Sequence, residues 1–322
     1  MFAYVIRRTL QLIPTLLVIS AIVFALLALK PGDPIDDLRR GNPGFTQEDY
    51  NRLIKLYGLD KPWYIRYWFW LRQAVQGNFG PSRTYGMPAA QYVFQNRLPN
   101  TLLLSGVSLA VAFVIAIPAG IVSALRQHTP TDYGITIFNF FGVSIPIFWY
   151  GILLIYFFAV VFRWLPAGSL QTPGIEGLWP TIVDRIRHLI LPVTALSTLQ
   201  MAQWTRFMRS SMLEVIHLDY IQTARAKGLS ERIVIFRHAL RNAILPIITL
   251  IALAVPLLFS GAILTETVFN WPGMGRGIYE SILVNDFNVA MVSLMFISVL
   301  ILIFNLLADI VYALVDPRIR YD

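Results

Sequence analysis

Few side chains in this sequence have the types and spacing that catalysis requires. The chain contains no cysteine, which excludes disulfides, thiolate nucleophiles and thiolate metal sites. Its four histidines show no metal-ligand spacing: His128, His188, His217 and His238. No Gly-Lys pair occurs, so the chain lacks the P-loop that holds nucleotide phosphates with backbone amides and a lysine. We expect no catalytic residue, no metal site and no cofactor bound by this chain.

The composition is that of a protein embedded in lipid. Hydrophobic residues make up 56% of the chain and charged residues 14%, with a mean hydropathy of +0.61. Soluble proteins average about 45–50% apolar and about 25% charged residues. The net charge of +8 could indicate nucleic-acid binding, but no soluble domain concentrates it, so we expect no nucleic-acid partner.

Six long runs contain no Asp, Glu, Lys or Arg, and each is about long enough to cross a bilayer, which takes about 20 residues of helix. The runs are residues 9–29, 98–125, 133–162, 188–205, 242–265 and 287–308. One such run could be a buried helix of a soluble protein, but six leave too little polar surface. Pro146, inside the third run, permits a kink. The sequence therefore predicts an all-α integral membrane protein with six transmembrane helices.

Orientation follows from the basic residues, because Lys and Arg in short loops stay in the cytoplasm. With a cytoplasmic N-terminus, twelve basic residues lie inside and only four lie in the short outer segments. Both termini are then cytoplasmic, and an extracytoplasmic segment of about 70 residues separates the first two spans. We expect two parts: residues 1–97, with the first span and this segment, and residues 98–322, a five-span core with a cytoplasmic loop at 206–241.

The outer segment contains an aromatic stretch at residues 63–75. Tryptophan, tyrosine and phenylalanine alternate there with Arg66 and Arg72. Aromatic rings combined with basic side chains are typical of the headgroup boundary of a membrane. We interpret the stretch as an interfacial anchor, with ligand stacking as the alternative.

The loop at 206–241 carries strong local helix signals. Asp219 can cap a helix with Gln222 as its capping-box partner, and Gly228 suits the left-handed residue that ends it, giving about two turns. Ser230 then caps a second helix, with Glu231 in its first turn, that leads into the fifth run. A helix this short is marginal in water. It is either a projection that docks on a partner through small residues such as Ala224 and Ala226, or an ordinary interhelical loop.

Polar residues that could line a pathway occur in two places. The fourth run carries Thr and Gln side chains that are costly against lipid, which places it inside the bundle. Just beyond the fifth run, a Pro and three Gly follow Glu266, so this stretch can fold back irregularly only where protein covers it. We hypothesise that it lines the outer mouth of a pathway. The candidates are Ser197, Gln200, Gln203, Glu266, Trp271, Pro272 and Gly273.

Residues 219–246, DYIQTARAKGLSERIVIFRHALRNAILP, resemble the cytoplasmic loop of permeases in binding-protein-dependent ABC importers, in the dipeptide, oligopeptide and nickel subfamily. The family pattern E-A-A, three residues, Gly is met by Gln222-Thr223-Ala224 and Gly228, with Gln in place of Glu. His238 and Arg241 replace the Ile and Pro of the later I-x-L-P. The subfamily forms D-Y-x-x-T-A-x-A-K-G and H-x-L-R-N fit better.

Further stretches resemble the same subfamily along nearly the whole chain. They are PGDP at 31, YGLDKP at 57, SIPIFWYG at 144, RSSMLEV at 209, LTETVFNWPGMGRG at 264 and DPRIRY at 316. The resemblance implies the type I ABC importer permease fold, a second homologous permease subunit, two ATP-binding subunits that hold ATP and Mg, and an extracytoplasmic substrate-binding protein. It also implies that residues 219–228 form a coupling helix seated in an ATPase subunit.

The coupling residues that the resemblance implies are Asp219, Tyr220, Gln222, Thr223, Ala224, Arg225, Ala226, Lys227, Gly228, Leu229, His238 and Asn242. The expected function is that of a non-enzymatic permease subunit for di- or oligopeptides in a bacterial or archaeal cytoplasmic membrane, in contact with lipid. The same type of importer for nickel, glutathione or oligosaccharides is the alternative.

Two functions of other classes are disfavoured. An ion-coupled carrier or channel acting alone would need ionisable residues within the spans, and only edge residues such as Glu266 and Asp309 are available. An intramembrane enzyme would need a nucleophile and a base, or metal ligands, facing each other, and none is evident.

Overall fold

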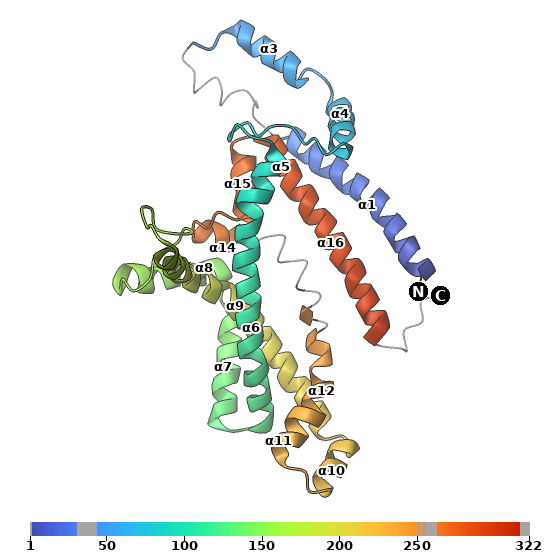
Figure 1. The fold of residues 1–322 in the computed structure, drawn as a ribbon, viewed down its shortest axis with the longest axis vertical. Helices are drawn as coiled ribbons and strands as arrows, with labels where there is room; N and C mark the ends of the chain where they lie inside the picture. Colours follow the sequence, from blue (N-terminus) through green and yellow to red (C-terminus); the bar gives the residue numbers. More distant parts are fainter. Residues whose placement is uncertain (1, 31–43, 249, 252–253, 255–262, 316–322) are drawn as a thin grey trace. The chain divides into compact units, whose positions relative to one another are not determined.

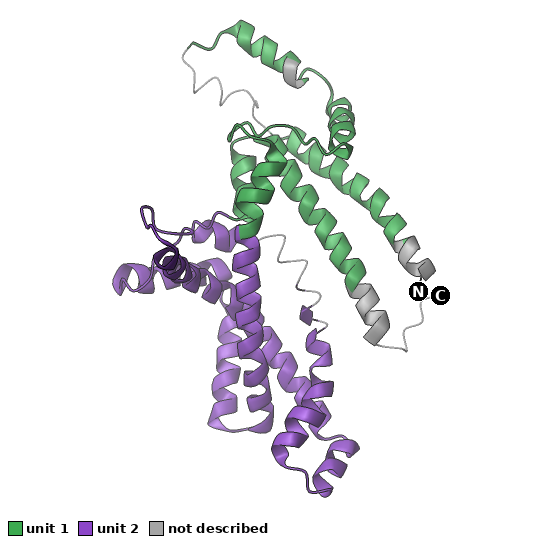
Figure 2. Cartoon of the chain, viewed as in Figure 1, with its two compact units in different colours: residues 1–99, 273–322 green, residues 100–272 purple. Residues whose placement is uncertain are grey.

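The computed structural model describes residues 2–30, 44–248, 250–251, 254 and 263–315 (Figure 1). The described residues are mainly helical, as the composition predicts, with an isolated β-bridge between Pro81 and Pro88. They fall into two units (Figure 2): residues 1–99 with 273–322, and residues 100–272.

The first unit contains two long apolar helices, α1 (Phe2–Ala28) and α16 (Phe287–Val315), which pack against each other. Between them in sequence lie α3 (Gln47–Tyr57), α4 (Trp63–Val75), α5 (Ala89–Tyr92), the π-helix η1 (Val93–Arg97) and α15 (Met274–Leu283). The core of this unit joins α5 and η1 to α15 and α16 through Tyr92, Val93, Met274 and Val292.

The second unit begins within α6 (Leu98–Leu125) and continues through α7 (Pro130–Ser144), α8 (Ile147–Leu154) and the π-helix η2 (Ile155–Val161). The 39-residue helix α9 (Leu178–Ile216) follows. Four short elements come next: α10 (Asp219–Ala226), α11 (Glu231–Ile233), the π-helix η3 (Val234–Ala239) and α12 (Leu240–Ala243). The last element of this unit is α14 (Ile263–Val268).

Helices suited to crossing a membrane appear where the first, second and sixth runs predict them. Within the described residues, three helices are long and apolar enough: Thr9–Ala28, Ala89–Leu125 and Phe287–Leu307. The bent pair α7 and α8–η2 is a fourth if it counts as one span. The fourth run lies inside α9, and part of the fifth run, namely residues 249, 252–253 and 255–262, lies outside the described residues.

Two boundaries differ from the sequence-based prediction. The third run, 133–162, is not one straight span: α7 and the next helix meet at 107°. Ile145, before Pro146, is extended (φ −92°, ψ 128°), because proline disfavours helical geometry in the residue before it. The fourth run extends on both sides into the single helix α9, which continues through Pro192.

Helices α6 and α9 approach closely at Gly120. A Cβ atom placed on this residue would lie 2.5 Å from the Cβ of Met208 and 2.9 Å from the carbonyl oxygen of Thr205. The carbonyl belongs to helix backbone and gives way less readily than a side chain does. Gly120 therefore sets the distance between the two helices.

Gly120→Ala should destabilise the protein by about 1–3 kcal/mol through overpacking, although alanine is the better helix former. Gly106→Ala is the matched control in the same helix, because nothing lies within 4 Å of its Cβ position. The control should be neutral or stabilise by roughly 0.5–1 kcal/mol. Thermal unfolding of the purified protein in detergent compares the two variants, and equal midpoints would contradict the close contact.

Candidate functional site

Helix α10 is the two-turn helix that the sequence predicts, but it begins differently. Leu218 holds the N-cap position and no side chain caps the helix. The Leu218 carbonyl accepts hydrogen bonds from the amides of Ile221 and Gln222 at 2.9 and 3.3 Å. Asp219 is therefore the first helical residue, and its predicted capping box with Gln222 is wrong. The Asp219 carboxylate still lies in the first turn, where the helix dipole favours negative charge.

The end of α10 confirms the prediction for Gly228. This residue adopts φ +75°, its amide donates to the Arg225 carbonyl at 2.9 Å, and the next amide donates to the Ala224 carbonyl at 3.4 Å. Only glycine adopts this conformation at little cost. Ser230 then occupies the N-cap position of α11 as predicted, but its side chain makes no capping hydrogen bond.

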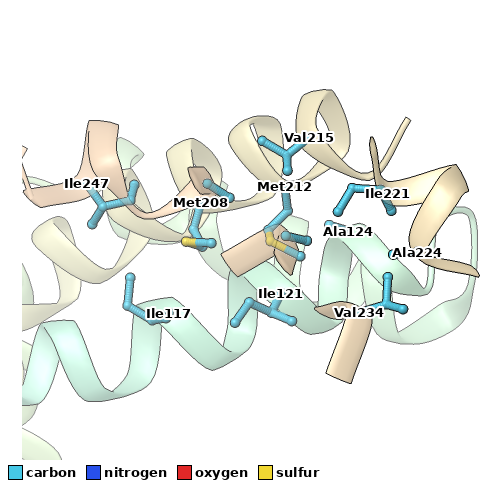
Figure 3. Close-up of a cluster of buried hydrophobic side chains, with 12 residues drawn as sticks. Ile117, Ile121, Ala124, Met208, Met212, Val215, Ile221, Ala224, Val234 and Ile247 are labelled. Carbon is cyan, nitrogen blue, oxygen red and sulfur yellow. The ribbon is translucent and has the colours of Figure 1, made fainter. Parts of the chain in front are cut away.

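One face of α10 is buried against its own chain (Figure 3). Ile221 and Ala224 are 0% and 6% exposed and enter a hydrophobic cluster that joins α6, α9, η3 and the following residues. Figure 3 shows Ile117 and Ile121 of α6 and Met208 and Met212 of α9 pointing into this cluster. Its buried members are Ile117, Ile121, Ala124, Met208, Met212, Val215, Ile221, Ala224, Val234, Ala239, Ala243 and Ile247. The segment 206–241 thus shares a core with the ends of two long helices.

This packing changes the interpretation of Ala224. A small residue at this position lets α10 approach α6 and α9, so Ala224 does not face a partner in this structure. Ala226, two residues later, is exposed, as are Thr223 and Lys227. Of the two alanines proposed for docking, Ala226 is the one on the open face of the helix.

Polar contacts fix α10 to the elements that follow it. The Asn242 side-chain amide donates to the Tyr220 hydroxyl at 2.7 Å, which joins α10 to α12. Arg225 donates two hydrogen bonds to the Glu231 carboxylate, at 2.7 and 3.2 Å, which joins α10 to α11. These bonds to Arg225 lower the pKa of Glu231 below its usual value, and the Glu231 carboxylate raises the pKa of Arg225. Both groups are therefore charged near neutral pH.

The exposed side of this region combines cations with apolar groups. Lys227 and Arg232 are exposed, and His238 is partly exposed. Among the large apolar side chains, Leu218, Leu229, Ile233 and Phe236 are 47%, 38%, 42% and 57% exposed. We call residues 218–236 the coupling projection, after the role that the resemblance implies for residues 219–228. Its mixed surface is suited to contact with another protein.

A buried ion pair that sequence reasoning did not identify lies near the same end of α9. Arg209 donates to both carboxylate oxygens of Asp132 at 3.0 Å, and the Ser123 hydroxyl and the His128 amide also donate to Asp132. Asp132 is 3% exposed. The pair ties the turn between α6 and α7 to α9. The sequence offered one signal for this ion pair, because Asp132 is the sole acidic residue in positions 98–175.

The stretch after the fifth run folds into a covered turn on α6. Glu266 and Trp271 are fully buried, and the Trp271 amide donates to the Glu266 carbonyl at 2.7 Å. The Thr101 hydroxyl donates to the Glu266 carboxylate at 2.8 Å, and the Trp271 indole donates to the Asn100 carbonyl at 3.0 Å. The Asn100 side chain in turn donates to the Pro272 carbonyl at 3.0 Å. Protein groups thus satisfy the irregular backbone of this stretch.

The candidate lining residues of α9 differ in exposure. Ser197 is 1% exposed, Gln200 is partly buried and Gln203 is exposed. Gly273, the last member of the candidate set, is buried, and Pro272 is partly buried. The structure therefore brings Glu266, Trp271 and Pro272 together at α6 and places the α9 side chains elsewhere in the same unit.

Apolar helices fit to cross a membrane, one of which, α6, packs together with α9 against a short helix, define a membrane-embedded protein. Two family models match the chain: the inner membrane component of binding-protein-dependent transport systems over residues 116–321, and the N-terminal part of such components over residues 1–106. The chain belongs to this family of inner-membrane transport components.

Curated relatives match along the whole chain. The oligopeptide transport system permease protein AppB of Bacillus subtilis (strain 168) is 45% identical over 322 residues, which is all of both chains. The di/tripeptide transport system permease protein DppB of Pseudomonas aeruginosa (strain UCBPP-PA14) is 37% identical, again over all of both chains. The dipeptide transport system permease protein DppB of Escherichia coli (strain K12) is 35% identical over all of this chain and 99% of that protein.

Arg209→Met should destabilise the protein by about 2–3 kcal/mol, because it leaves the buried Asp132 charge unpaired. Removal of one partner from a fully buried ion pair costs about 3–5 kcal/mol. We expect a smaller loss because the Arg209 side chain is 30% exposed. Arg206→Met, one turn earlier on α9 at an exposed position, is the control and should change stability by less than about 0.5 kcal/mol. Adding Asp132→Asn to Arg209→Met should restore part of the loss in thermal unfolding. No recovery would contradict an ion pair.

Proposed function

We propose that this chain is a permease subunit of an ATP-driven importer for di- or oligopeptides, with the type I ABC importer permease fold. The observation that carries the proposal is the coupling projection, which has one face seated on α6 and α9 and the other face exposed. The names of the relatives, which describe peptide permeases at 35–45% identity over the whole chain, support peptides as the cargo.

In the proposed topology, six spans place both termini in the cytoplasm and residues 30–97 outside. The coupling projection then lies on the cytoplasmic side, where two ATP-binding subunits hold ATP and Mg. A second homologous permease subunit supplies the other half of the pathway, and an extracytoplasmic binding protein delivers the cargo. The family description, which names transport that depends on a binding protein, supports this assembly.

The contacts of α10 supply a mechanical route from such partners into the membrane. A displacement of α10 carries Ile221 and Ala224, which lie in one core with α6 and α9. The Ser211 hydroxyl donates to the Ala243 carbonyl at 2.8 Å, so α12 moves with α9. The Asp132–Arg209 pair extends the connection to the turn before α7. Dense packing transmits such a displacement with little loss.

The covered turn 266–272 is the proposed outer gate. Its hydrogen bonds reach the N-terminal end of α6, so a tilt of α6 that originates at α10 acts on the turn through Asn100 and Thr101. Gln200 and Gln203 are proposed to line the pathway and to make weak contacts with varied cargo, because tight binding there would slow release.

The same type of importer for nickel chelates, glutathione or oligosaccharides is the nearest alternative. Reconstitution of the chain with its partner subunits in liposomes should give peptide uptake that requires ATP, both ATP-binding subunits and the binding protein. Vesicles with this chain alone are the control and should show no uptake. Uptake into those vesicles, driven by an ion gradient, would instead support a carrier acting alone. Competition by unlabelled peptides, nickel, glutathione and oligosaccharides identifies the cargo.

Substitutions of two alanines in α10 distinguish an effect on docking from an effect on folding. Ala226→Glu should leave the thermal unfolding midpoint unchanged but reduce co-purification of the ATP-binding subunits about tenfold or more, since a charged group would be buried at the contact. Ala224→Glu places a carboxylate in the chain's own core, which should lower the accumulation of folded protein itself. Normal association and transport by Ala226→Glu would refute docking through this face.

A further inference from the structure

An apolar groove runs along α16 in the first unit. It has a volume of about 280 Å³, and α4 forms one wall through Trp70, Leu71, Ala74 and Val75. Phe79 and Phe94 lie along it, and α16 contributes Val292, Met295, Phe296 and Val299. None of these side chains carries a charge. The indole nitrogen of Trp70 is buried and donates no hydrogen bond within the described part of the chain.

A basic cavity of about 400 Å³ shares Trp70 and Phe79 with this groove. The described lining of the cavity contains no carboxylate and four cations, which are Lys55, Lys61, Arg66 and Arg83. Arg66 lies one turn before Trp70 on the same face of α4, because residues four apart are neighbours on a helix. Burial and the charge of Arg83 lower the pKa of Arg66. Among the described residues no carboxylate pairs with Arg66.

The basic cavity lies at the start of α16 and the apolar groove lies further along the same helix. Phe287 and Asn288, at its start, line the basic cavity, and Val299 lines the apolar groove. At 1.5 Å per residue, Asn288 and Val299 lie about 16 Å apart. This is about half of the roughly 30 Å hydrocarbon core, or the depth of one leaflet. The site is therefore shaped for a molecule with an anionic head and an apolar tail that spans one leaflet.

We propose that this composite site binds an anionic glycerophospholipid of the outer leaflet. The phosphate faces Arg66 and the lysines, an acyl chain lies in the groove along Val292 and Phe296, and a lipid oxygen accepts from the Trp70 indole. Bound lipid would hold α4 against α16. The placement in the outer leaflet rests on the proposed topology, whereas the chemistry of the site rests on the first unit alone. A hydrophobic peptide is the competing occupant.

The test uses the complete transporter, purified in detergent and analysed by native mass spectrometry and thermal shift. Phosphatidylglycerol should remain bound and raise the unfolding midpoint more than phosphatidylcholine does. Arg66→Gln should weaken retention about tenfold, because it removes charge-assisted bonds to phosphate. Trp70→Phe should weaken it less, about fivefold, because it removes one neutral donor. Ala74→Phe should fill the groove and displace the acyl chain.

Arg72→Gln is the matched control, since Arg72 is an exposed cation on α4 that lines neither cavity. It should retain the lipid as the unmodified protein does. Equal retention of both lipids, an equal loss in Arg72→Gln, or full competition by glycerophosphoglycerol without acyl chains would overturn the proposal. So would displacement of the lipid by cargo peptides. ATP-dependent uptake, measured separately, reports on the proposed function and can fail independently of lipid retention.

Discussion

The structure of the second unit depends on the burial of one face of a helix too short to be stable alone. Helix α10 has eight residues, and isolated helices of that length are marginal in water. Ile221 is 0% exposed, and burying a side chain of this size stabilises a fold by about 1.5–3 kcal/mol. The cluster around it contains residues of α6, α9 and η3, so the same contact that holds α10 also fixes the ends of two long helices. A displacement of the coupling projection would therefore also displace α6 and α9.

A second constraint comes from the bilayer, which leaves no room for unsatisfied backbone groups exposed to lipid. Two of the helix breaks among the described residues, at Pro146 and after α14, differ in how their backbone groups are arranged. At Pro146 the next helix starts at once and turns by 107°. After α14 the backbone is irregular, and two of its carbonyls accept hydrogen bonds from distant residues. The Phe269 carbonyl accepts from the Ser169 amide at 2.8 Å, and the Pro272 carbonyl accepts from the Asn100 side chain at 3.0 Å. Gly168 permits this approach, because a Cβ there would collide with the Phe269 carbonyl.

Sequence patterns predicted the features that local chemistry determines. The apolar runs 9–29, 98–125 and 287–308 correspond to helices, and Gly228 ends α10 in the left-handed conformation. The patterns failed where contacts with residues distant in sequence determine which side chains are paired or buried. The bond between Asp132 and Arg209 spans 77 positions, and the buried face of α10 is set by α6, almost a hundred residues earlier. Asp219 shows the limit at short range: a competent capping residue loses the cap position when the helix begins one residue sooner.

The charged side chains near the ends of the long helices fall into two groups: those that form ion pairs within the chain and those that do not. Near α10, ion pairs are satisfied within the chain: Arg225 with Glu231, and Arg209 with Asp132. Such paired charges orient elements and leave little net attraction for small ions or polar ligands. In the described part of the first unit no carboxylate pairs with Arg66, which lines a cavity that shares Trp70 and Phe79 with an apolar groove. The paired charges hold α10 and α9 to their own chain, whereas a cation beside an apolar groove suits a ligand that is itself amphipathic. The proposed lipid site depends on this difference.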